Sequence, residues 1–189
     1  MTQEGDLRAM QKQMQERGFV PDAIVLTAGV QQDDMEGAYD HTRGEKVIAT
    51  NLNGSLACVQ VFLPEFLLRR SGSFVAIAST SALRPSRRSA SYAASKAGLA
   101  MAFRSFRARY SKDGVRFKTV YLGPIQTSMW EGKSRWLVPG ASRAAKRIAS
   151  FITSSSSLLY YPTLSTTLLR VSLWIPDRVF SALSTFLLK

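Results

Sequence analysis

Cysteine and long apolar runs are both scarce in this sequence. Cys58 is the single cysteine among 189 residues, so no disulfide can form within the chain, and this usage fits a reducing compartment. No run of about 18 apolar residues occurs, which argues against a simple membrane-spanning helix. The first residues are polar and lack the apolar segment of a signal peptide. We therefore predict a cytoplasmic protein.

Acidic residues are also few, because 13 Asp and Glu stand against 25 Lys and Arg, for a net charge of +12. This excess favours anionic partners, such as a phosphorylated cofactor, an anionic substrate or an anionic membrane surface. The basic residues are scattered, with small clusters at Arg84, Arg87 and Arg88 and at Arg143, Lys146 and Arg147. Zinc-finger spacings and the aromatic-basic patterns of RNA-binding motifs are missing, so we predict neither a metal site nor a nucleic-acid partner.

Short apolar runs alternate with helical patterns along the chain. The predicted strands cover residues 23–26, 73–78, 115–121 and 158–161, and the predicted helices cover 6–17, 43–68, 91–111 and 141–151. Apolar runs without polar alternation suit strands that are buried on both faces. We therefore predict an α/β fold with a doubly wound parallel sheet, Rossmann-like and three-layered (α/β/α). In such sheets ligands bind beyond the carboxyl ends of the strands, where Gly29, Ser79 and Gly123 lie.

The strongest chemical signal is Ser79 followed by the segment Tyr92-Ala-Ala-Ser-Lys96. Tyr92 and Lys96 are four residues apart, so on a helix they share one face. A free phenol has a pKa near 10, and a neighbouring cation lowers that pKa. Ser79 is placed to hydrogen-bond a substrate oxygen and hold it against Tyr92. The three residues then predict a proton-transfer site for interconverting a carbonyl and an alcohol. Taken alone, the tyrosine–lysine pair is an ordinary helical pattern.

The surrounding motifs resemble those of the short-chain dehydrogenase/reductase family. The order and spacing of five segments match that family: Asp22–Gly29, Asn51–Gly54, Ile77–Ser79, Tyr92–Lys96 and Gly123–Thr127. The resemblance implies an oxidoreductase that moves hydride between NAD(P)H and a small-molecule carbonyl or secondary alcohol. We favour NADP slightly over NAD as the cofactor, and the resemblance implies a homo-oligomer for the full-length form.

The resemblance also implies roles for individual residues. Tyr92 would be the general acid/base, and Lys96 would lower its pKa and bind the nicotinamide ribose. Ser79 would orient the substrate oxygen, and Asn51 would hold a water molecule at a kink in the long helix. The residues expected beside the cofactor are Ala28, Gly29, Tyr92, Lys96, Pro124, Ile125 and Thr127. The simpler interpretations are a helix-interior asparagine at Asn51 and a plain turn at Gly123 and Pro124.

The sequence departs from the family in one respect. The family begins with a strand and a Thr-Gly-x-x-x-Gly-x-Gly loop that binds the cofactor pyrophosphate at a helix N-terminus, and this motif does not occur here. We therefore expect an N-terminally truncated member that lacks the first strands and the glycine-rich loop and binds NAD(P)H poorly. The alternative function is a catalytically inactive scaffold or a membrane-associated binding module.

Two basic or apolar segments lie outside these motifs. Arg84, Arg87 and Arg88 follow Ser79, and we favour a solvated surface loop over a site for an anionic substrate. Residues 1–162 form the predicted partial Rossmann-like catalytic domain, and residues 163–189 form an apolar, amphipathic tail of two short helices hinged at Pro176. This tail either covers the substrate pocket or a subunit interface, which we favour slightly, or makes peripheral contact with a membrane.

Overall fold

The computed structural model describes residues 4–127 and 138–187. The elements are α1 (Glu4–Glu16), β1 (Ala23–Leu26), α2 (His41–Ile48), a π-helical turn (Ala49–Asn53), α3 (Gly54–Arg69), β2 (Ser73–Ser79), a 3-10 turn (Thr80–Ala82), α4 (Ala90–Tyr110), a second 3-10 turn (Ser111–Asp113), β3 (Arg116–Leu122), α5 (Ala141–Thr153), β4 (Leu158–Tyr161), α6 (Thr163–Ser172) and α7 (Asp177–Leu187). The predicted strands and helices are confirmed to within a few residues.

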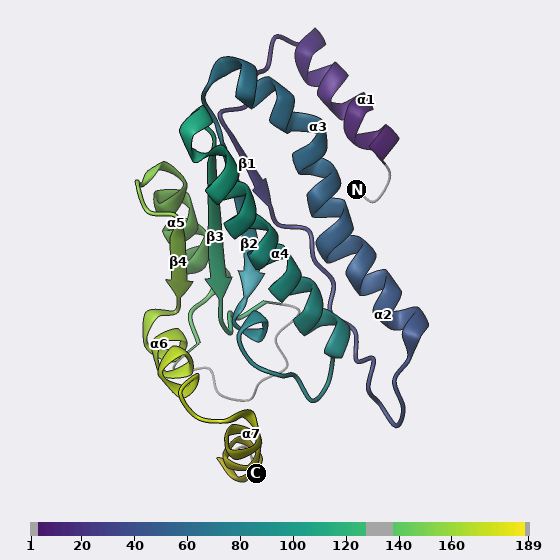
Figure 1. Cartoon of the computed structure of the whole chain (residues 1–189), viewed down its shortest axis with the longest axis vertical. Helices are drawn as coiled ribbons and strands as arrows, with labels where there is room; N and C mark the ends of the chain where they lie inside the picture. The colour runs from purple at the N-terminus through teal and green to yellow at the C-terminus, as the bar shows by residue number, and fades with distance from the viewer. Residues whose placement is uncertain (1–3, 128–137, 188–189) are drawn as a thin grey trace.

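The strands form one parallel sheet in the order β1-β2-β3-β4 (Figure 1). The register pairs Ser79 with Leu122 and Leu122 with Tyr161, so β2, β3 and β4 end at one level. Because all four strands run the same way, their carboxyl ends meet at one edge of the sheet. This edge is where the sequence places the candidate site.

Helices cover both faces of the sheet, which makes the predicted three-layer α/β fold. Phe74 and Phe117 pack in a core with residues of α1, α3 and α4, and their rings stack at 5.2 Å between centroids. Val75 and Val120 face the other way and pack against Phe151 of α5. Neighbouring strand residues point to opposite faces, so the unbroken apolar runs of β2 and β3 serve two cores at once.

The predicted long helix is interrupted by the π-helical turn at Ala49–Asn53, which contains Asn51. The combined helix His41–Arg69 is long and apolar enough to cross a membrane by length and composition. Its residues Val59, Phe62 and Phe66 belong to the core beneath the sheet, however, and the core helix of a globular domain passes the same test. We interpret it as a core helix.

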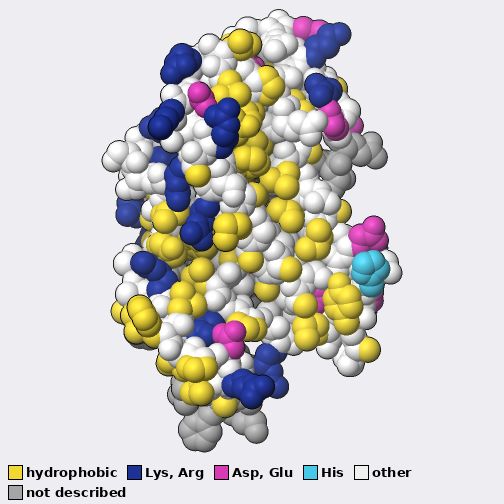
Figure 2. All heavy atoms as spheres, viewed as in Figure 1, with side chains coloured by type: hydrophobic (Ala, Val, Ile, Leu, Met, Phe, Trp, Pro, Cys, Tyr) yellow, Lys and Arg dark blue, Asp and Glu magenta, His cyan; other side chains and the backbone are white. Residues whose placement is uncertain are grey.

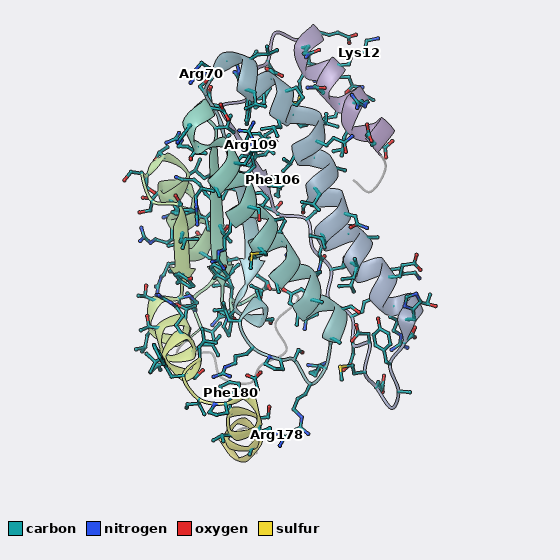
Figure 3. The ribbon with its side chains drawn as sticks, viewed as in Figure 1. Lys12, Arg70, Phe106, Arg109, Arg178 and Phe180 are labelled. Carbon is teal, nitrogen blue, oxygen red and sulfur yellow. The ribbon has the colours of Figure 1, made fainter. Side chains whose placement is uncertain are left out.

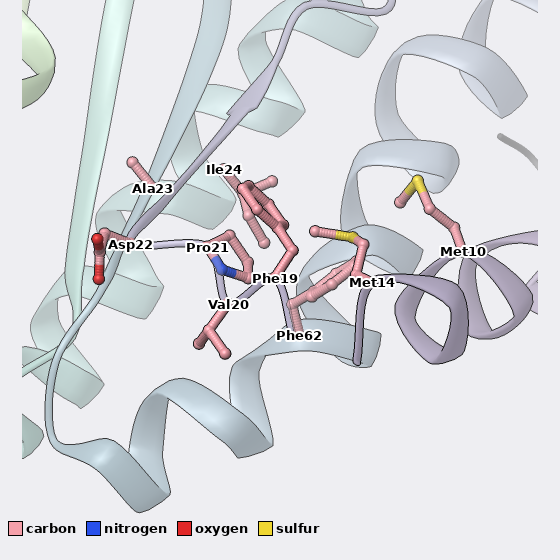
Figure 4. Close-up of a pocket in the computed structure, with 9 residues that line it drawn as sticks. All are labelled: Met10, Met14, Phe19, Val20, Pro21, Asp22, Ala23, Ile24 and Phe62. Atoms are coloured by element: carbon pink, nitrogen blue, oxygen red, sulfur yellow. The ribbon is translucent and has the colours of Figure 1, made fainter. Parts of the chain in front are cut away.

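An apolar hollow lies beside β1, one of the two edge strands of the sheet (Figure 4). It is lined by Met10, Met14, Phe19, Val20, Pro21, Asp22, Ala23, Ile24 and Phe62. These residues come from α1, the loop between α1 and β1, the start of β1, and α3. Residues of the candidate catalytic set do not line it, so the hollow is separate from the candidate site.

The tail contains the two predicted helices, α6 and α7, with Pro176 between them. The arginine loop after Ser79 differs from its prediction, because Arg84 is buried instead of solvated. Its guanidinium forms an ion pair with Asp177, donates to the carbonyl oxygens of Ser172 and Ile175, and lies 4.3 Å from the ring centroid of Phe180. Arg84 therefore joins the tail to the loop that follows β2.

Lys118 is a buried cation that sequence reasoning missed. It lies in the middle of β3, with 1% of its surface exposed, and its ammonium donates to the carbonyls of Phe151, Ile152 and Ser154 at 2.6–2.9 Å. These carbonyls end α5, where a helix has unsatisfied acceptors and a partial negative charge. Burial and the neighbouring charge of Arg116 lower the pKa of Lys118.

Replacing Lys118 with methionine tests this capping role. Lys118→Met leaves the carbonyls of Ile152 and Ser154 without their donor, so we expect the free energy of unfolding to fall by about 2–4 kcal/mol. Urea unfolding measures the change. Lys112→Met, which removes an exposed ammonium, is the matched control and should change the stability by less than about 0.5 kcal/mol. Equal stability of the Lys118 variant and the native protein would contradict the role.

Candidate active site

Ser79 and Tyr92 meet at the carboxyl edge of the sheet. Ser79 is the last residue of β2, and its hydroxyl accepts a hydrogen bond of 3.1 Å from the amide of Ser81 in the 3-10 turn that follows. Tyr92 lies in the first turn of α4, and its phenol makes a hydrogen bond with the Ser79 side chain. The structure thus brings together the two hydroxyls that the sequence analysis assigned to the substrate oxygen.

Lys96 lies one turn along α4 from Tyr92. Its ammonium is 5.9 Å from the centroid of the Tyr92 ring and donates a 2.9 Å hydrogen bond to the carbonyl of Ile77 in β2. Only 4% of Lys96 is exposed, and this burial lowers the pKa of its ammonium to about 8. Tyr92 and Lys96 therefore share a helix face, as the spacing predicts.

The pKa of Tyr92 shifts in the direction opposite to the predicted one. Burial of the phenol raises this pKa, and the hydrogen bond with Ser79 offsets only part of the effect. A buried phenolate loses hydration, and the Lys96 ammonium is directed to the carbonyl of Ile77. In the protein without ligands, Tyr92 is consequently held as a neutral phenol at neutral pH.

Asn51 ties three segments together at the predicted kink. It is fully buried, its side-chain oxygen accepts from the amide of Val30, and its side-chain nitrogen donates to the carbonyl of Val30 and the hydroxyl of Ser95. These bonds are 2.8–3.1 Å long. Asn51 therefore joins the loop after β1 to α4, beside Lys96.

Gly29 lies against this group, in the loop after β1, while its neighbour Ala28 is half-buried. A Cβ atom at Gly29 would come within 3.1 Å of the Lys96 ammonium and 3.6 Å of the Asn51 oxygen. A side chain here would thus crowd the lysine, and only glycine leaves the backbone this close to it. The structure brings Gly29, Asn51 and Lys96 into one cluster.

The loop after β3 holds the remaining predicted cofactor residues. Pro124 and Thr127 are exposed, Ile125 is buried, and the Thr127 hydroxyl lies 3.5 Å from the carbonyl of Ile125. A Cβ atom at Gly123 would come within 3.2 Å of Pro162 and 3.4 Å of Thr166, so the start of α6 packs against this loop. The loop leaves the same sheet edge as Ser79.

Asp34 is a positioning residue that sequence reasoning missed. Its fully buried carboxylate accepts hydrogen bonds of 2.9 Å from the amides of Ala90 and Ser91, and the Ser89 hydroxyl accepts from the amide of Tyr92. Burial raises the pKa of Asp34, but hydrogen bonds from Ser91, Ala90 and Ser89 outweigh it, so the net pKa is lowered. Ser89 carries a readable N-cap signal three residues before Tyr92. Asp34, 56 residues from Ala90, carries none.

In the described parts of the chain, no group of three or more His, Cys, Asp and Glu side chains lies together as metal ligands would. The site that these residues form has two hydroxyls and one ammonium at a buried sheet edge. This set can exchange a proton with a substrate oxygen, and it holds no acidic group that would ligate a cation.

The family profile for short chain dehydrogenases matches residues 1–138 of the 189 in the chain. The chain belongs to the short-chain dehydrogenase/reductase family. This assignment confirms the family resemblance.

Individual relatives agree with this assignment. An uncharacterized oxidoreductase of Staphylococcus haemolyticus is 31% identical over 110 residues, which are 58% of this chain and 48% of the relative. Estradiol 17-beta-dehydrogenase 2 of Rattus norvegicus is 34% identical over 116 residues, 60% of this chain and 30% of that protein. The chain spans about half the length, or less, of these curated relatives.

Solved structures agree on the fold. A short chain dehydrogenase from Burkholderia cenocepacia in complex with NADP superposes with a TM-score of 0.79 at 19% identity. The match covers 96% of this chain and 76% of that one. At this identity the similarity confirms the Rossmann-like α/β arrangement of the sheet and helices, and it says nothing of the substrate.

Asp34→Ala tests how the start of α4 is held. The change removes the acceptor for two buried amides, so we expect the free energy of unfolding to fall by about 1–3 kcal/mol. Urea unfolding followed by circular dichroism measures it. Asp22→Ala, at an exposed carboxylate just before β1, is the control and should have little effect. A stability unchanged by Asp34→Ala would mean that α4 starts without this support.

The pKa of Lys96 predicts a pH dependence of stability. The folded lysine titrates at about 8 and an ordinary lysine at 10.5, so below pH 8 both states are protonated and burial of the ammonium opposes folding. Between these values the folded lysine loses its proton first, and its contribution to the free energy of unfolding rises with pH by about 3 kcal/mol.

Urea unfolding at pH 8 and pH 10.5 measures this contribution as the difference between the native protein and Lys96→Met. The native protein should gain stability relative to the variant as the pH rises. Lys46→Met, at an exposed position on α2, should leave the pH profile unchanged. Parallel profiles for the native protein and Lys96→Met would contradict the lowered pKa.

Proposed function

We propose that the chain carries the proton-transfer site of an NAD(P)-dependent oxidoreductase that interconverts a carbonyl compound and a secondary alcohol. The observation that carries this proposal is the meeting of Tyr92 and Ser79 at the carboxyl edge of the sheet, with the Lys96 ammonium 5.9 Å from the phenol ring. A hydrogen-bonded pair of hydroxyls beside a buried cation suits exchange of a proton with one substrate oxygen.

In this proposal Ser79 donates a hydrogen bond to the substrate oxygen and holds it against the phenol of Tyr92. Tyr92 gives its proton to that oxygen when a carbonyl is reduced and takes it back when an alcohol is oxidised. The raised pKa of Tyr92 keeps the phenol protonated before reduction, and the Lys96 ammonium stabilises the phenolate that forms afterwards.

The residues around Gly29 fit a nicotinamide cofactor, which supplies or accepts the hydride when bound. Gly29 has no side chain at the point where backbone, Lys96 and Asn51 converge, so the backbone of the loop after β1 comes close to the lysine. Lys96 would hold the ribose hydroxyls, and Ala28 would lie beside them. On the loop after β3, Pro124, Ile125 and Thr127 would border the nicotinamide. NADP is our preferred cofactor, because the net charge of +12 suits the extra phosphate and the Burkholderia neighbour binds NADP.

The proposal has three further parts: a role for Asn51, the extent of the catalytic domain, and the state of the full-length protein. Asn51 would bind the relay water through the free lone pair of its side-chain oxygen, because both amide hydrogens already have protein acceptors. Residues 1–162 would act as the catalytic domain, and the full-length protein would be a cytoplasmic homo-oligomer. The second candidate is a scaffold without catalysis, in which Asn51 serves only to join the loop after β1 to α4.

Tyr92→Phe tests the assignment. The change removes the transferable proton and keeps the ring, so we expect turnover to fall by at least about 100-fold. The assay follows oxidation of NADPH by the 189-residue chain with a panel of small aldehydes and ketones. NADPH is supplied in large excess, because the sequence lacks the glycine-rich loop and weak binding is expected. Tyr110→Phe, at the far end of α4, is the matched control and should retain activity.

Circular dichroism and calorimetric titration with NADPH should be the same for Tyr92→Phe as for the native chain. Activity retained by Tyr92→Phe would overturn the assignment. A native chain that binds NADPH but turns over none of the substrates would favour the scaffold.

A further inference from the structure

Helix α6 is amphipathic, but its polar side faces the body of the protein. Thr166 is fully buried, and its hydroxyl donates to the carbonyl of Pro162 at 2.7 Å. One turn later, the guanidinium of Arg170 lies 4.3 Å from the ring centroid of Tyr160 in β4. Positions 166 and 170 share one face of the helix, so this face forms the contact with the sheet.

The opposite side of α6 is apolar and exposed. Leu164, Leu168 and Val171 follow each other at spacings of four and three, which places them on one face, and Trp174 continues the line in the turn after the helix. Their exposed fractions are 68%, 63%, 62% and 91%. We call these four residues the tail apolar face. Figure 2 shows hydrophobic side chains gathered at the surface over α6, with Lys and Arg side chains beside them.

The outward direction of this face is fixed by Arg84. This buried arginine donates to the carbonyls that end α6, pairs with Asp177 and lies over the ring of Phe180 in α7. Figure 3 shows Phe180 on the side of α7 nearest the body. The tail is thus held by arginines on its inner side, and its apolar side is left without a covering element in the described chain.

The C-terminal segment that carries the tail apolar face has a net positive charge. In residues 141–187 the exposed basic residues are Arg143, Lys146, Arg147, Arg170 and Arg178. Asp177 is the single acidic residue in that range, and its ion pair with Arg84 offsets its charge. An apolar face on a segment of net positive charge has chemistry complementary to an apolar layer under anionic head groups.

We propose that the tail apolar face docks on the surface of an anionic lipid bilayer. Trp174, nearly fully exposed, suits the zone between head groups and acyl chains. A second copy of the chain fits less well, because two faces with the same positive surroundings repel each other. A stable dimer also buries about 20–30 residues on each partner, far more than this face offers.

Docking would have a defined orientation. Helix α6 begins two residues after β4 ends at Tyr161, and β4 ends level with Leu122 and Ser79. The bilayer would therefore lie toward the carboxyl edge of the sheet. The proposal does not depend on the oxidoreductase activity, because the face and its charges are present whether or not the site turns over.

Vesicle co-sedimentation of the 189-residue chain tests the proposal. We expect the chain to sediment with vesicles of equal parts phosphatidylcholine and phosphatidylglycerol, and to bind vesicles of phosphatidylcholine alone at least about tenfold more weakly. High salt should weaken binding to the anionic vesicles, because it screens the basic residues. The double variant Leu168→Ser/Trp174→Ser should lower the affinity by about tenfold or more.

The matched control is Leu68→Ser/Met101→Ser, which removes two exposed apolar side chains, 87% and 55% exposed, from α3 and α4. It should bind like the native chain, and circular dichroism should show both variants folded. Equal binding to neutral and anionic vesicles, or binding unchanged by the tail variant, would overturn the proposal. So would sedimentation velocity that shows a dimer dissolved by the tail variant, because the face would then serve a second copy.

Discussion

The start of α4 is the constraint on which the candidate site depends. Tyr92 lies in the first turn of this helix and Lys96 in the next, so any slip of the N-terminus would displace both from Ser79. Asp34 and Ser89 together accept three backbone amides at this end, and the carboxylate of Asp34 is fully buried while doing so. Free amides and an anion at a helix N-terminus stabilise each other, which explains why the loop after β1 is tied to a helix so far along the chain.

Burial gives the site its electrostatic character. It raises the pKa of Tyr92 and lowers the pKa of Lys96 to about 8, so the same loss of hydration favours the neutral form of both groups. By themselves these shifts make the Tyr92 phenolate harder to form and the Lys96 ammonium easier to deprotonate. A neutral phenol is nevertheless the form needed to give a proton to a carbonyl oxygen, and the lysine beside it becomes more favourable as a cation once the phenol ionises.

In the tail, Arg84 has a structural role that the basic sequence around it did not predict. Arg84 belongs to a basic loop beside the site, yet it is buried and contacts backbone carbonyls, an aspartate and an aromatic ring of the tail. Because arginine side chains hold α6 and α7 from within, the leucines and the tryptophan are left on the outside. The result is a surface whose apolar stripe and positive surroundings point to one kind of partner.

The sequence by itself determined the strands, the helices and the family, because unbroken apolar runs and five motifs in order are local properties of the chain. It also placed Ser79, Tyr92 and Lys96 together, since strand ends and helical spacing have few geometric solutions. Only the tertiary structure decided what faces what: the carboxylate of Asp34 beneath α4, Lys118 under the end of α5, Arg84 in the tail, and the direction of the pKa of Tyr92. These features depend on burial and on contacts between segments far apart in sequence, so the local sequence pattern does not predict them.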